Sequence, residues 1–244
     1  MNPASILLMS ATLNEIKPLI DKYSFKSNDG IFFQSASNLA PFDILITGIG
    51  IHAMIYTLTK HLFTHSCRFV INAGICGALN HDLQIGDVCV VVTDEFSDFG
   101  VEYPDGFKTL FAENLLDADE PPFRNGRLYS DFNTNNYKSI NALRKVSGST
   151  SQTVHGRFET IAEIRTRCNP DVETMEGAAA FYVCKRAGID ILQIRSVSNY
   201  VEPRNKAKWN IEMAVNNLNI VLENLIMDIN ESSQKKEGVR GSIQ

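Results

Sequence analysis

Two acidic residues and one amide stand where an enzyme could use them, each just after a predicted strand. Glu15 follows the apolar segment 5–11, Glu176 follows the strand at 171–175, and Asn199 follows the strand at 190–198. Carboxylates can act as general bases and stabilise positive charge, and an amide can donate hydrogen bonds. Ligands of open α/β sheets bind at the carboxyl ends of strands. The three residues therefore predict a catalytic site at one edge of a sheet.

The pattern of apolar residues predicts the elements that position this site. Strands are expected at 5–11, 31–36, 42–47, 68–73, 87–93, 143–150, 171–175 and 190–198. Helices are expected at 13–23, 51–65, 157–167, 177–187 and 209–229. Residues 98–140 are rich in Asp, Asn, Pro and Gly and predict a long loop, with a helical signal only near 108–117. This alternation predicts an α/β fold with a mixed, largely parallel sheet covered by helices.

Composition predicts a globular domain at residues 1–229, because 44% of the chain is hydrophobic and 21% is charged. Residues 230–244 lack hydrophobic periodicity and predict a disordered tail. A net charge of −5 disfavours binding to nucleic acid or to an anionic membrane. No apolar run approaches the ~18 residues of a membrane span, and the N-terminus lacks a secretory pattern. A cytoplasmic protein with a small ligand is therefore expected.

Cofactor and metal motifs are incomplete in this sequence. Segment 48–53 (GIGIHA) matches a dinucleotide-binding pattern, but no acidic residue lies between 51 and 81 to bind a ribose. His61 and His65 have the spacing of metal ligands but no third ligand nearby, so a solvated helix end is expected. Five widely spaced cysteines predict reduced, mostly buried thiols. We expect no metal and no organic cofactor.

Seven short segments together carry a resemblance over nearly the whole chain, up to about residue 228. They are the turn at Glu15, TGIG, INAGICGAL, LQIGDV, VSGS, ETMEGAA and IRSVSN. They resemble the nucleoside phosphorylase and nucleosidase superfamily, which includes methylthioadenosine/adenosylhomocysteine nucleosidases. The resemblance implies one three-layer α/β/α sandwich domain, a purine nucleoside substrate and a homo-oligomer. Segments 173–180 and RSVSNYVEPRNKAKWNI resemble futalosine hydrolases in particular, which release hypoxanthine on a route to menaquinone.

The resemblance implies a role for each residue on the sugar side. Glu15 would activate the attacking water as general base, yet Thr12-x-x-Glu15 is also a capping box, and one carboxylate would not easily serve both. Glu176 would accept hydrogen bonds from the ribose hydroxyls, with Met175 against the sugar. The alternative for Glu176 is an acid favoured by a helix dipole. Arg195 would steady these carboxylates and the water, or form a structural ion pair.

Asn199 is the most informative residue on the base side. Adenine-specific relatives carry aspartate there, whereas an amide can donate its two hydrogens to the carbonyl oxygen and N7 of a 6-oxopurine. Asn199 thus predicts hypoxanthine over adenine, with a structural asparagine as the alternative. Gly74 would permit close backbone approach, and Ile75 replaces a polar residue of many relatives, which disfavours methylthioadenosine. Further candidates for substrate binding, or else ordinary loop residues, are Thr150, Ser151 and Ser198.

The loop at 10–14 lacks the glycine and arginines with which phosphorolytic relatives bind phosphate, so water is the expected nucleophile. Three alternatives stay open: a methylthioadenosine/adenosylhomocysteine nucleosidase, an inosine phosphorylase and a non-catalytic purine nucleoside-binding protein. The carboxyphenyl group of futalosine would need a cation or several donors. Candidates are Arg204, Lys206, Lys208 and Arg157, while Trp209 would line that end of the pocket or anchor the last helix.

Overall fold

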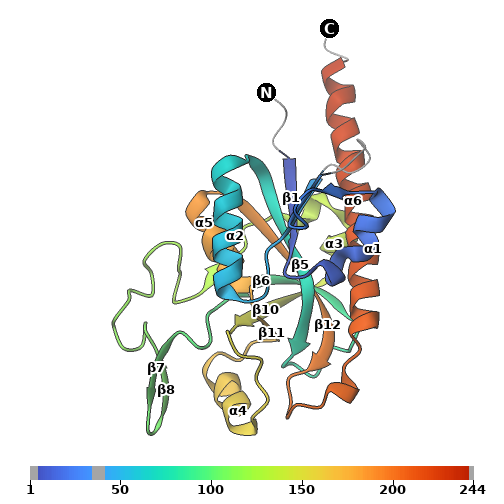
Figure 1. The fold of residues 1–244 in the computed structure, drawn as a ribbon. Helices are drawn as coiled ribbons and strands as arrows, with labels where there is room; N and C mark the ends of the chain where they lie inside the picture. Colours follow the sequence, from blue (N-terminus) through green and yellow to red (C-terminus); the bar gives the residue numbers. More distant parts are fainter. Residues whose placement is uncertain (1–4, 35–41, 242–244) are drawn as a thin grey trace.

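The computed structural model of this chain describes residues 5–34 and 42–241, and a central sheet has helices on both faces (Figure 1). The strands are β1 (Ser5–Ser10), β2 (Lys26–Ser27), β3 (Phe32–Gln34), β4 (Phe42–Ile46), β5 (Cys67–Ala78), β6 (Val88–Asp94), β7 (Gly100–Tyr103), β8 (Gly106–Thr109), β9 (Leu128–Tyr129), β10 (Arg144–Thr150), β11 (Val172–Thr174) and β12 (Asp190–Tyr200). The α-helices are α1 (Leu13–Tyr23), α2 (Ile51–Thr64), α3 (Lys138–Asn141), α4 (Phe158–Arg167), α5 (Gly177–Ala187) and α6 (Ile211–Gly241).

The strand order is β11-β10-β6-β12-β5-β1-β4-β3-β2. Strand β1 pairs in parallel with β4 and β5, β5 with β12, and β10 with β6 and β11. The pairs β12–β6, β3–β4 and β2–β3 are antiparallel, so the sheet is mixed and largely parallel as predicted. In addition, β11 pairs antiparallel with the end of β5. The sheet therefore curls back on itself and brings the ends of β5, β11 and β12 together.

The layers follow from alternation along the buried strands. In β1, Ile6 and Leu8 join a core with α1 and α6, whereas Leu7 and Met9 join a core with α2 and α5. Successive side chains of a strand point to opposite faces, so a strand that is apolar at every position requires cover on both. Figure 1 shows α2 and α5 on one face and α1 and α6 on the other. The predicted three-layer α/β/α sandwich is confirmed.

Three segments differ from the sequence prediction. Strand β5 continues past 68–73 to Ala78, because its second half pairs with β12 and β11. The signal near 108–117 forms the end of β8 and then turns rather than a helix, and Asn114 has a positive φ of 55°, which interrupts helical geometry. The expected disordered tail is instead helical as far as Gly241, since extending an existing helix costs far less than starting one.

The C-terminal end of α2 also differs from expectation. His61 is buried, and its ring stacks on that of His65 at 4.3 Å between centroids. Phe32 packs on both rings, at 4.9 and 5.2 Å. Burial, and then the charge of His65, lowers the pKa of His61 to about 4. His61 is therefore buried in an aromatic contact with Phe32, whereas His65 is exposed, as predicted for a solvated helix end.

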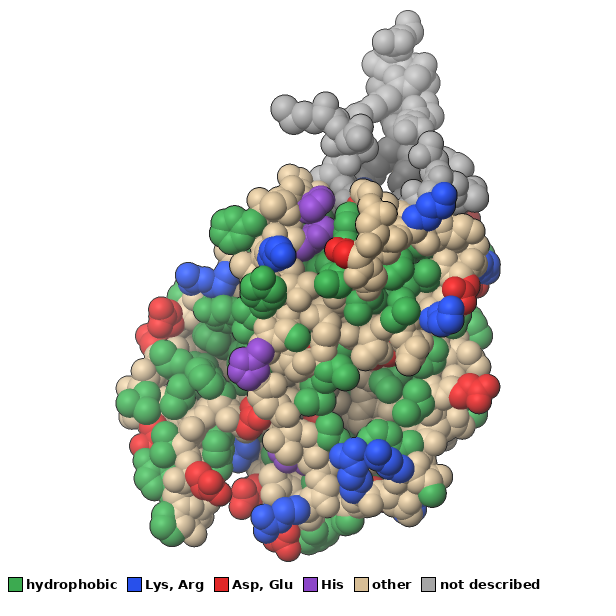
Figure 2. Space-filling model, viewed as in Figure 1, with side chains coloured by type: hydrophobic (Ala, Val, Ile, Leu, Met, Phe, Trp, Pro, Cys, Tyr) green, Lys and Arg blue, Asp and Glu red, His purple; other side chains and the backbone are tan. Residues whose placement is uncertain are grey.

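Among residues 5–34 and 42–241, no helix combines the length and apolar character needed to cross a membrane. On the face seen in Figure 2, acidic and basic side chains are interspersed over the described part of the chain. Exposed aromatic side chains occur on α2, where Tyr56 is 68% and Phe63 86% exposed.

Candidate active site

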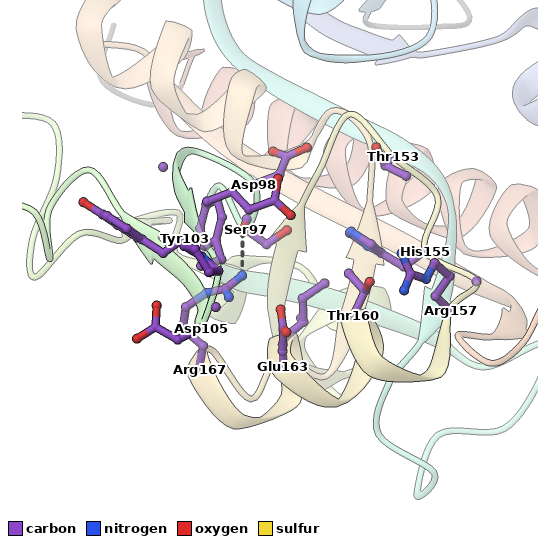
Figure 3. Close-up of a pocket in the computed structure, with 17 residues that line it drawn as sticks. Ser97, Asp98, Tyr103, Asp105, Thr153, His155, Arg157, Thr160, Glu163 and Arg167 are labelled. Atoms are coloured by element: carbon purple, nitrogen blue, oxygen red, sulfur yellow. Dashed lines mark hydrogen bonds between the residues drawn. The ribbon is translucent and has the colours of Figure 1, made fainter.

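One cavity of about 390 Å³ gathers most of the predicted site residues where the ends of β5, β11 and β12 meet the start of α1. The predicted residues that line it are Glu15, Ile75, Met175, Glu176, Ser198 and Asn199. Gly74, Arg195, Thr150 and Ser151 are not part of its wall. A second cavity, of about 790 Å³, lies between the β7–β8 hairpin and α4 (Figure 3) and contains none of these ten residues.

The carboxylate of Glu15 serves two purposes at once. Its Oε2 accepts hydrogen bonds from the Thr12 backbone N–H (2.9 Å), the Thr12 hydroxyl (2.8 Å) and the Ser10 hydroxyl (3.1 Å). Its Oε1 accepts the backbone N–H of Ile75 at 3.0 Å. The capping box is therefore real, but it occupies one oxygen only. Because each carboxylate oxygen has two acceptor positions, Oε1 keeps one for a water or substrate.

Arg195 is the largest fully buried side chain among the described residues, at 1% exposure. A Cβ at the paired residue Gly74 would lie 2.2 Å from Arg195 Nη1 and 2.7 Å from Glu15 Oε1. Only glycine thus lets these two groups approach. Within the described chain, Arg195 Nε and Nη2 have no hydrogen-bond partner, and the guanidinium forms no ion pair. Because buried donors of this kind are nearly always satisfied, we expect buried water at these two atoms, whereas Nη1 is the guanidinium atom beside Gly74 and Glu15.

Glu176 is buried directly before α5, and its Oε1 accepts the backbone N–H of Gly50 at 2.8 Å. Burial raises the pKa of this carboxyl, the nearby Arg195 charge and the Gly50 N–H lower it, and Glu15 raises it again. The free N–H groups of α5 bind elsewhere: Thr174 Oγ1 accepts from Gly177 and Thr150 Oγ1 accepts from Ala178. Glu176 is therefore turned toward α2 and the cavity and does not cap its own helix.

The amide of Asn199 has a fixed orientation. Its Oδ1 accepts the Ser198 hydroxyl at 2.8 Å, and its Nδ2 donates to the Tyr200 carbonyl at 3.0 Å. A carbonyl oxygen can only accept, so the Tyr200 contact identifies the nitrogen of the amide. One donor hydrogen of Nδ2 remains for a ligand, one fewer than the sequence suggested.

Thr150 and Ser151 support the site from outside the cavity. The Thr150 hydroxyl donates to Asp94 Oδ1 at 2.9 Å besides accepting from α5. The Ser151 hydroxyl donates to Asp98 Oδ2 at 3.0 Å. Both residues hold the loop after β10 and the start of α5 in place.

A buried polar network beneath the site is not among the sequence candidates. Gln193 Nε2 donates to Asp94 Oδ2 (3.0 Å), and Asn72 Nδ2 donates to Gln193 Oε1 (3.1 Å). Burial raises the pKa of Asp94 to about 7, against hydrogen bonds from Gln193 and Thr150 that lower it. The sequence does carry a signal for this network, because Asn72 and Gln193 are polar residues within apolar strands. The same signal points to Arg195.

We expect the Asp94→Asn substitution to flatten the pH dependence of stability. The folded-state pKa of about 7 lies above the ordinary 3.8, so the stabilising contribution is complete below pH 3.8 and is lost as pH rises through 7. Wild type should therefore lose roughly 2 to 3 kcal/mol of unfolding free energy between pH 5 and 8 through this group, and the variant should not. Asn72 Oδ1 has no partner among the described residues, so the amides of Asn72 and Gln193 can flip to accommodate the substituted side chain.

Urea unfolding at pH 5, 6, 7 and 8 measures this difference, with the exposed Asp190→Asn substitution as control. Equal slopes in wild type and Asp94→Asn would contradict the assignment of a raised pKa to Asp94.

His155 and Glu173 also line the cavity, and sequence analysis does not single them out. Glu173 belongs to β11, and His155 lies in the loop between β10 and α4. The sequence does not fix the direction of a loop side chain, so the approach of His155 to Glu173 could not be predicted.

Comparison with known proteins identifies the family. Residues 5–227 match the family model described as Phosphorylase superfamily. The chain belongs to this superfamily. A futalosine hydrolase of Streptomyces coelicolor is 28% identical to it over 149 residues, which are 60% of this chain and 60% of that enzyme. The superfamily resemblance and the α/β fold predicted from sequence are therefore confirmed. The alignment spans only three fifths of the length of that curated relative.

Solved structures share the fold of this chain. A futalosine hydrolase of Helicobacter pylori aligns with a TM-score of 0.72 at 18% identity, covering 92% of this chain and 98% of that one. A methylthioadenosine/adenosylhomocysteine nucleosidase of Neisseria meningitidis, in complex with methylthio-immucillin-A, aligns with a TM-score of 0.76 at 18% identity, covering 92% and 99%. At this identity the alignments establish the fold and leave the substrate open.

Proposed function

We propose that the chain hydrolyses the N-glycosidic bond of a 6-oxopurine nucleoside, with futalosine as its substrate. The observation that carries this proposal is one cavity lined by Glu15, Glu176 and the oriented amide of Asn199. Breaking the bond builds positive charge on the ribose and negative charge on the base. Two carboxylates match the first charge and an amide donor matches the second.

On the sugar side, Glu15 and Arg195 act on the attacking water, and Glu176 and Met175 bind the ribose. Water binds between Glu15 Oε1 and Arg195 Nη1, the two atoms that approach each other over Gly74, and Glu15 takes its proton as the water attacks the ribose. Glu176 accepts hydrogen bonds from the 2' and 3' hydroxyls through the oxygen that does not bind Gly50. Met175 lies against the apolar face of the sugar. Hydrogen bonds alone can stabilise the departing base, so the mechanism requires no metal ion or organic cofactor.

Water is favoured over phosphate by the donors around the first loop. The backbone N–H groups of Thr12, Gly48 and Gly50 all donate to acceptors of the protein itself. Residues 10–14 contain no lysine or arginine. An anion there would find no lysine or arginine in residues 10–14, and these three backbone donors are already occupied, so phosphate would bind weakly.

The choice of futalosine rests on the open side of the cavity. Arg204 and Trp209 both line it, and the Arg204 guanidinium carbon lies 5.4 Å from the centroid of the Trp209 ring. A carboxyphenyl group beyond the ribose could stack on the indole and pair with the guanidinium. The other candidate cations are less suited: Lys206 does not line the cavity, Lys208 is ion-paired, and Arg157 borders the second cavity.

The assay that tests the proposal incubates the purified protein with futalosine, methylthioadenosine and inosine, each with and without phosphate. Chromatography of the free base should show hypoxanthine released from futalosine at a rate independent of phosphate. Release of adenine from methylthioadenosine would favour the alternative nucleosidase, and a strict phosphate requirement would favour an inosine phosphorylase. Tight binding of a nucleoside without release of its base would favour a non-catalytic purine nucleoside-binding protein.

We expect Asn199→Asp to move the enzyme's preference toward a 6-aminopurine. An aspartate accepts from an exocyclic amine, whereas it repels the carbonyl oxygen of hypoxanthine unless it is protonated. The ratio of kcat/KM for the 6-oxo nucleoside to that for its 6-amino counterpart should fall about 100-fold. Competition between the two nucleosides in one reaction measures the ratio directly. An unchanged ratio would mean that Asn199 does not contact the base.

The homo-oligomer implied by the resemblance and a cytoplasmic location stay predictions. Light scattering of the purified protein would test the first.

A further inference from the structure

A glycine separates Asn199 from a second polar group across three neighbouring strands. Asn199 on β12 is paired with Gly77 on β5, and Gly77 is paired with Glu173 on β11. Neighbouring strands lie about 4.8 Å apart, so Glu173 and Asn199 flank Gly77 at roughly 10 Å from each other. All three residues line the cavity of about 390 Å³ that also holds Glu15 and Glu176, called the nucleoside cavity below.

Because Gly77 has no side chain, the cavity wall between Glu173 and Asn199 is bare backbone. A Cβ there would lie 2.7 Å from Val201 Cγ2 and 3.3 Å from Asn199 Nδ2, so a side chain is not tolerated. A planar base resting over Gly77 would have the Asn199 amide at one edge. Its other edge would face the side of the cavity formed by Glu173 and His155.

Both carboxylate oxygens of Glu173 bind His155. The imidazole Nδ1 hydrogen-bonds to Glu173 Oε2, and the His155 backbone N–H donates to Glu173 Oε1 at 3.3 Å. The side chains are 8% and 5% exposed, and within the described chain the carboxylate has no lysine or arginine partner. Because the carboxylate accepts, the ring hydrogen is on Nδ1. The carboxylate thus fixes both the direction and the tautomer of the ring.

The other ring nitrogen is open. In the part of the chain that the structure describes, no group bonds to His155 Nε2, and His155 lines both the nucleoside cavity and the second cavity. Figure 3 shows His155 beside Arg157 and Thr160, across the second cavity from Tyr103. In the neutral ring, Nδ1 carries the only hydrogen and Nε2 is a pure acceptor.

We infer that His155, oriented by Glu173, is a specificity residue whose Nε2 accepts the N1–H of a 6-oxopurine. The inference rests on the proposed function and extends it to a second contact with the base. A 6-oxopurine presents an acceptor at O6 and a donor at N1, whereas a 6-aminopurine presents a donor and an acceptor in the same places. The free donor of Asn199 and the acceptor of His155 match the first pattern. Adenine would place its amine, a donor, against the donor of Asn199, and its N1, an acceptor, against the acceptor of His155.

Three substitutions test this contact. His155→Gln removes the fixed acceptor, because an amide can rotate to present either group. Glu173→Gln is sharper: its oxygen keeps the His155 backbone N–H, and its amide nitrogen donates to Nδ1, which moves the ring hydrogen to Nε2. His65→Gln, at the far end of α2, is the matched control.

The measured quantity is the ratio of kcat/KM for futalosine to that for the same nucleoside with adenine in place of hypoxanthine. His155→Gln should lower this ratio about 10- to 100-fold. Glu173→Gln should lower it further, by raising activity on the 6-amino nucleoside, and His65→Gln should not change it. Binding of free hypoxanthine and adenine, measured by calorimetry, should change in the same direction.

A merely structural role would reduce both activities equally, so an unchanged ratio in His155→Gln and Glu173→Gln would overturn the inference. If His155→Gln does not fold, as judged by circular dichroism, Glu173→Gln decides alone. A wild-type enzyme that cleaves neither nucleoside, or that prefers the 6-amino one, would overturn the proposed function itself. A wild type that prefers futalosine, with variants of equal preference, would overturn only the role of His155.

Discussion

Glu15→Gln should lower kcat/KM for nucleoside hydrolysis by about 10²- to 10⁴-fold, the usual contribution of a general base. Glutamine has nearly the shape of glutamate, so the nucleoside should still bind. The loss should therefore fall on kcat, because the amide cannot take a proton from the attacking water. Single-turnover measurements on futalosine would separate the chemical step from binding and product release.

The same substitution should also destabilise the protein. Both oxygens of Glu15 accept N–H or O–H groups, and a glutamine must turn its own NH₂ toward some of these donors. Leaving a buried donor unsatisfied costs about 1–3 kcal/mol of unfolding free energy. Asp21→Asn is the matched control, since Asp21 is an exposed acid on the same helix that pairs with Lys17 at 2.9 Å. A Glu15→Gln protein with unchanged kcat would refute its role as general base.

Glu176→Gln should lower kcat/KM by about 10²- to 10³-fold, because charge-assisted hydrogen bonds to two hydroxyls are weakened together. Unlike Glu15→Gln, the Glu176→Gln substitution should stabilise the folded protein. Burial and the nearby Glu15 raise the pKa of Glu176, so the ionised group is costly to the folded state and this cost grows as pH rises. A neutral glutamine removes it, and thermal unfolding at pH 8 should show a higher Tm.

Deoxynucleosides make the test of Glu176 specific. Removing the 2' or 3' hydroxyl from the substrate should cost wild type activity and should cost the Glu176→Gln variant much less, because the two changes disrupt the same contact. The exposed Glu163→Gln variant on α4 should behave as wild type. Additive losses from the substitution and the missing hydroxyl would show that Glu176 does not bind the ribose.

Local patterns in the sequence were sufficient for the architecture. The uninterrupted apolar run of β1 requires cover on both faces, and the alternating strands and helices lead to a largely parallel sheet. Strands β1 and β12 both run parallel to β5, so Glu15 and Asn199 could be grouped from their positions after strands. Glu176 joins them only because β11 runs antiparallel to the end of β5, where the sheet curls back on itself. The end of α6 was misjudged because weak periodicity says little about a helix that is already nucleated.

Only the tertiary structure decided which atom of each site residue is free. Gly50 binds one oxygen of Glu176 across 126 residues, and Ile75 binds one oxygen of Glu15 across 60. Tyr200 consumes one hydrogen of Asn199, and Glu173 sets the tautomer of His155. Side-chain types and strand ends are local properties that a sequence records directly. Hydrogen-bond partners depend on how the sheet curls and how loops pack. Residues far apart in the sequence come within hydrogen-bonding distance only in the folded chain.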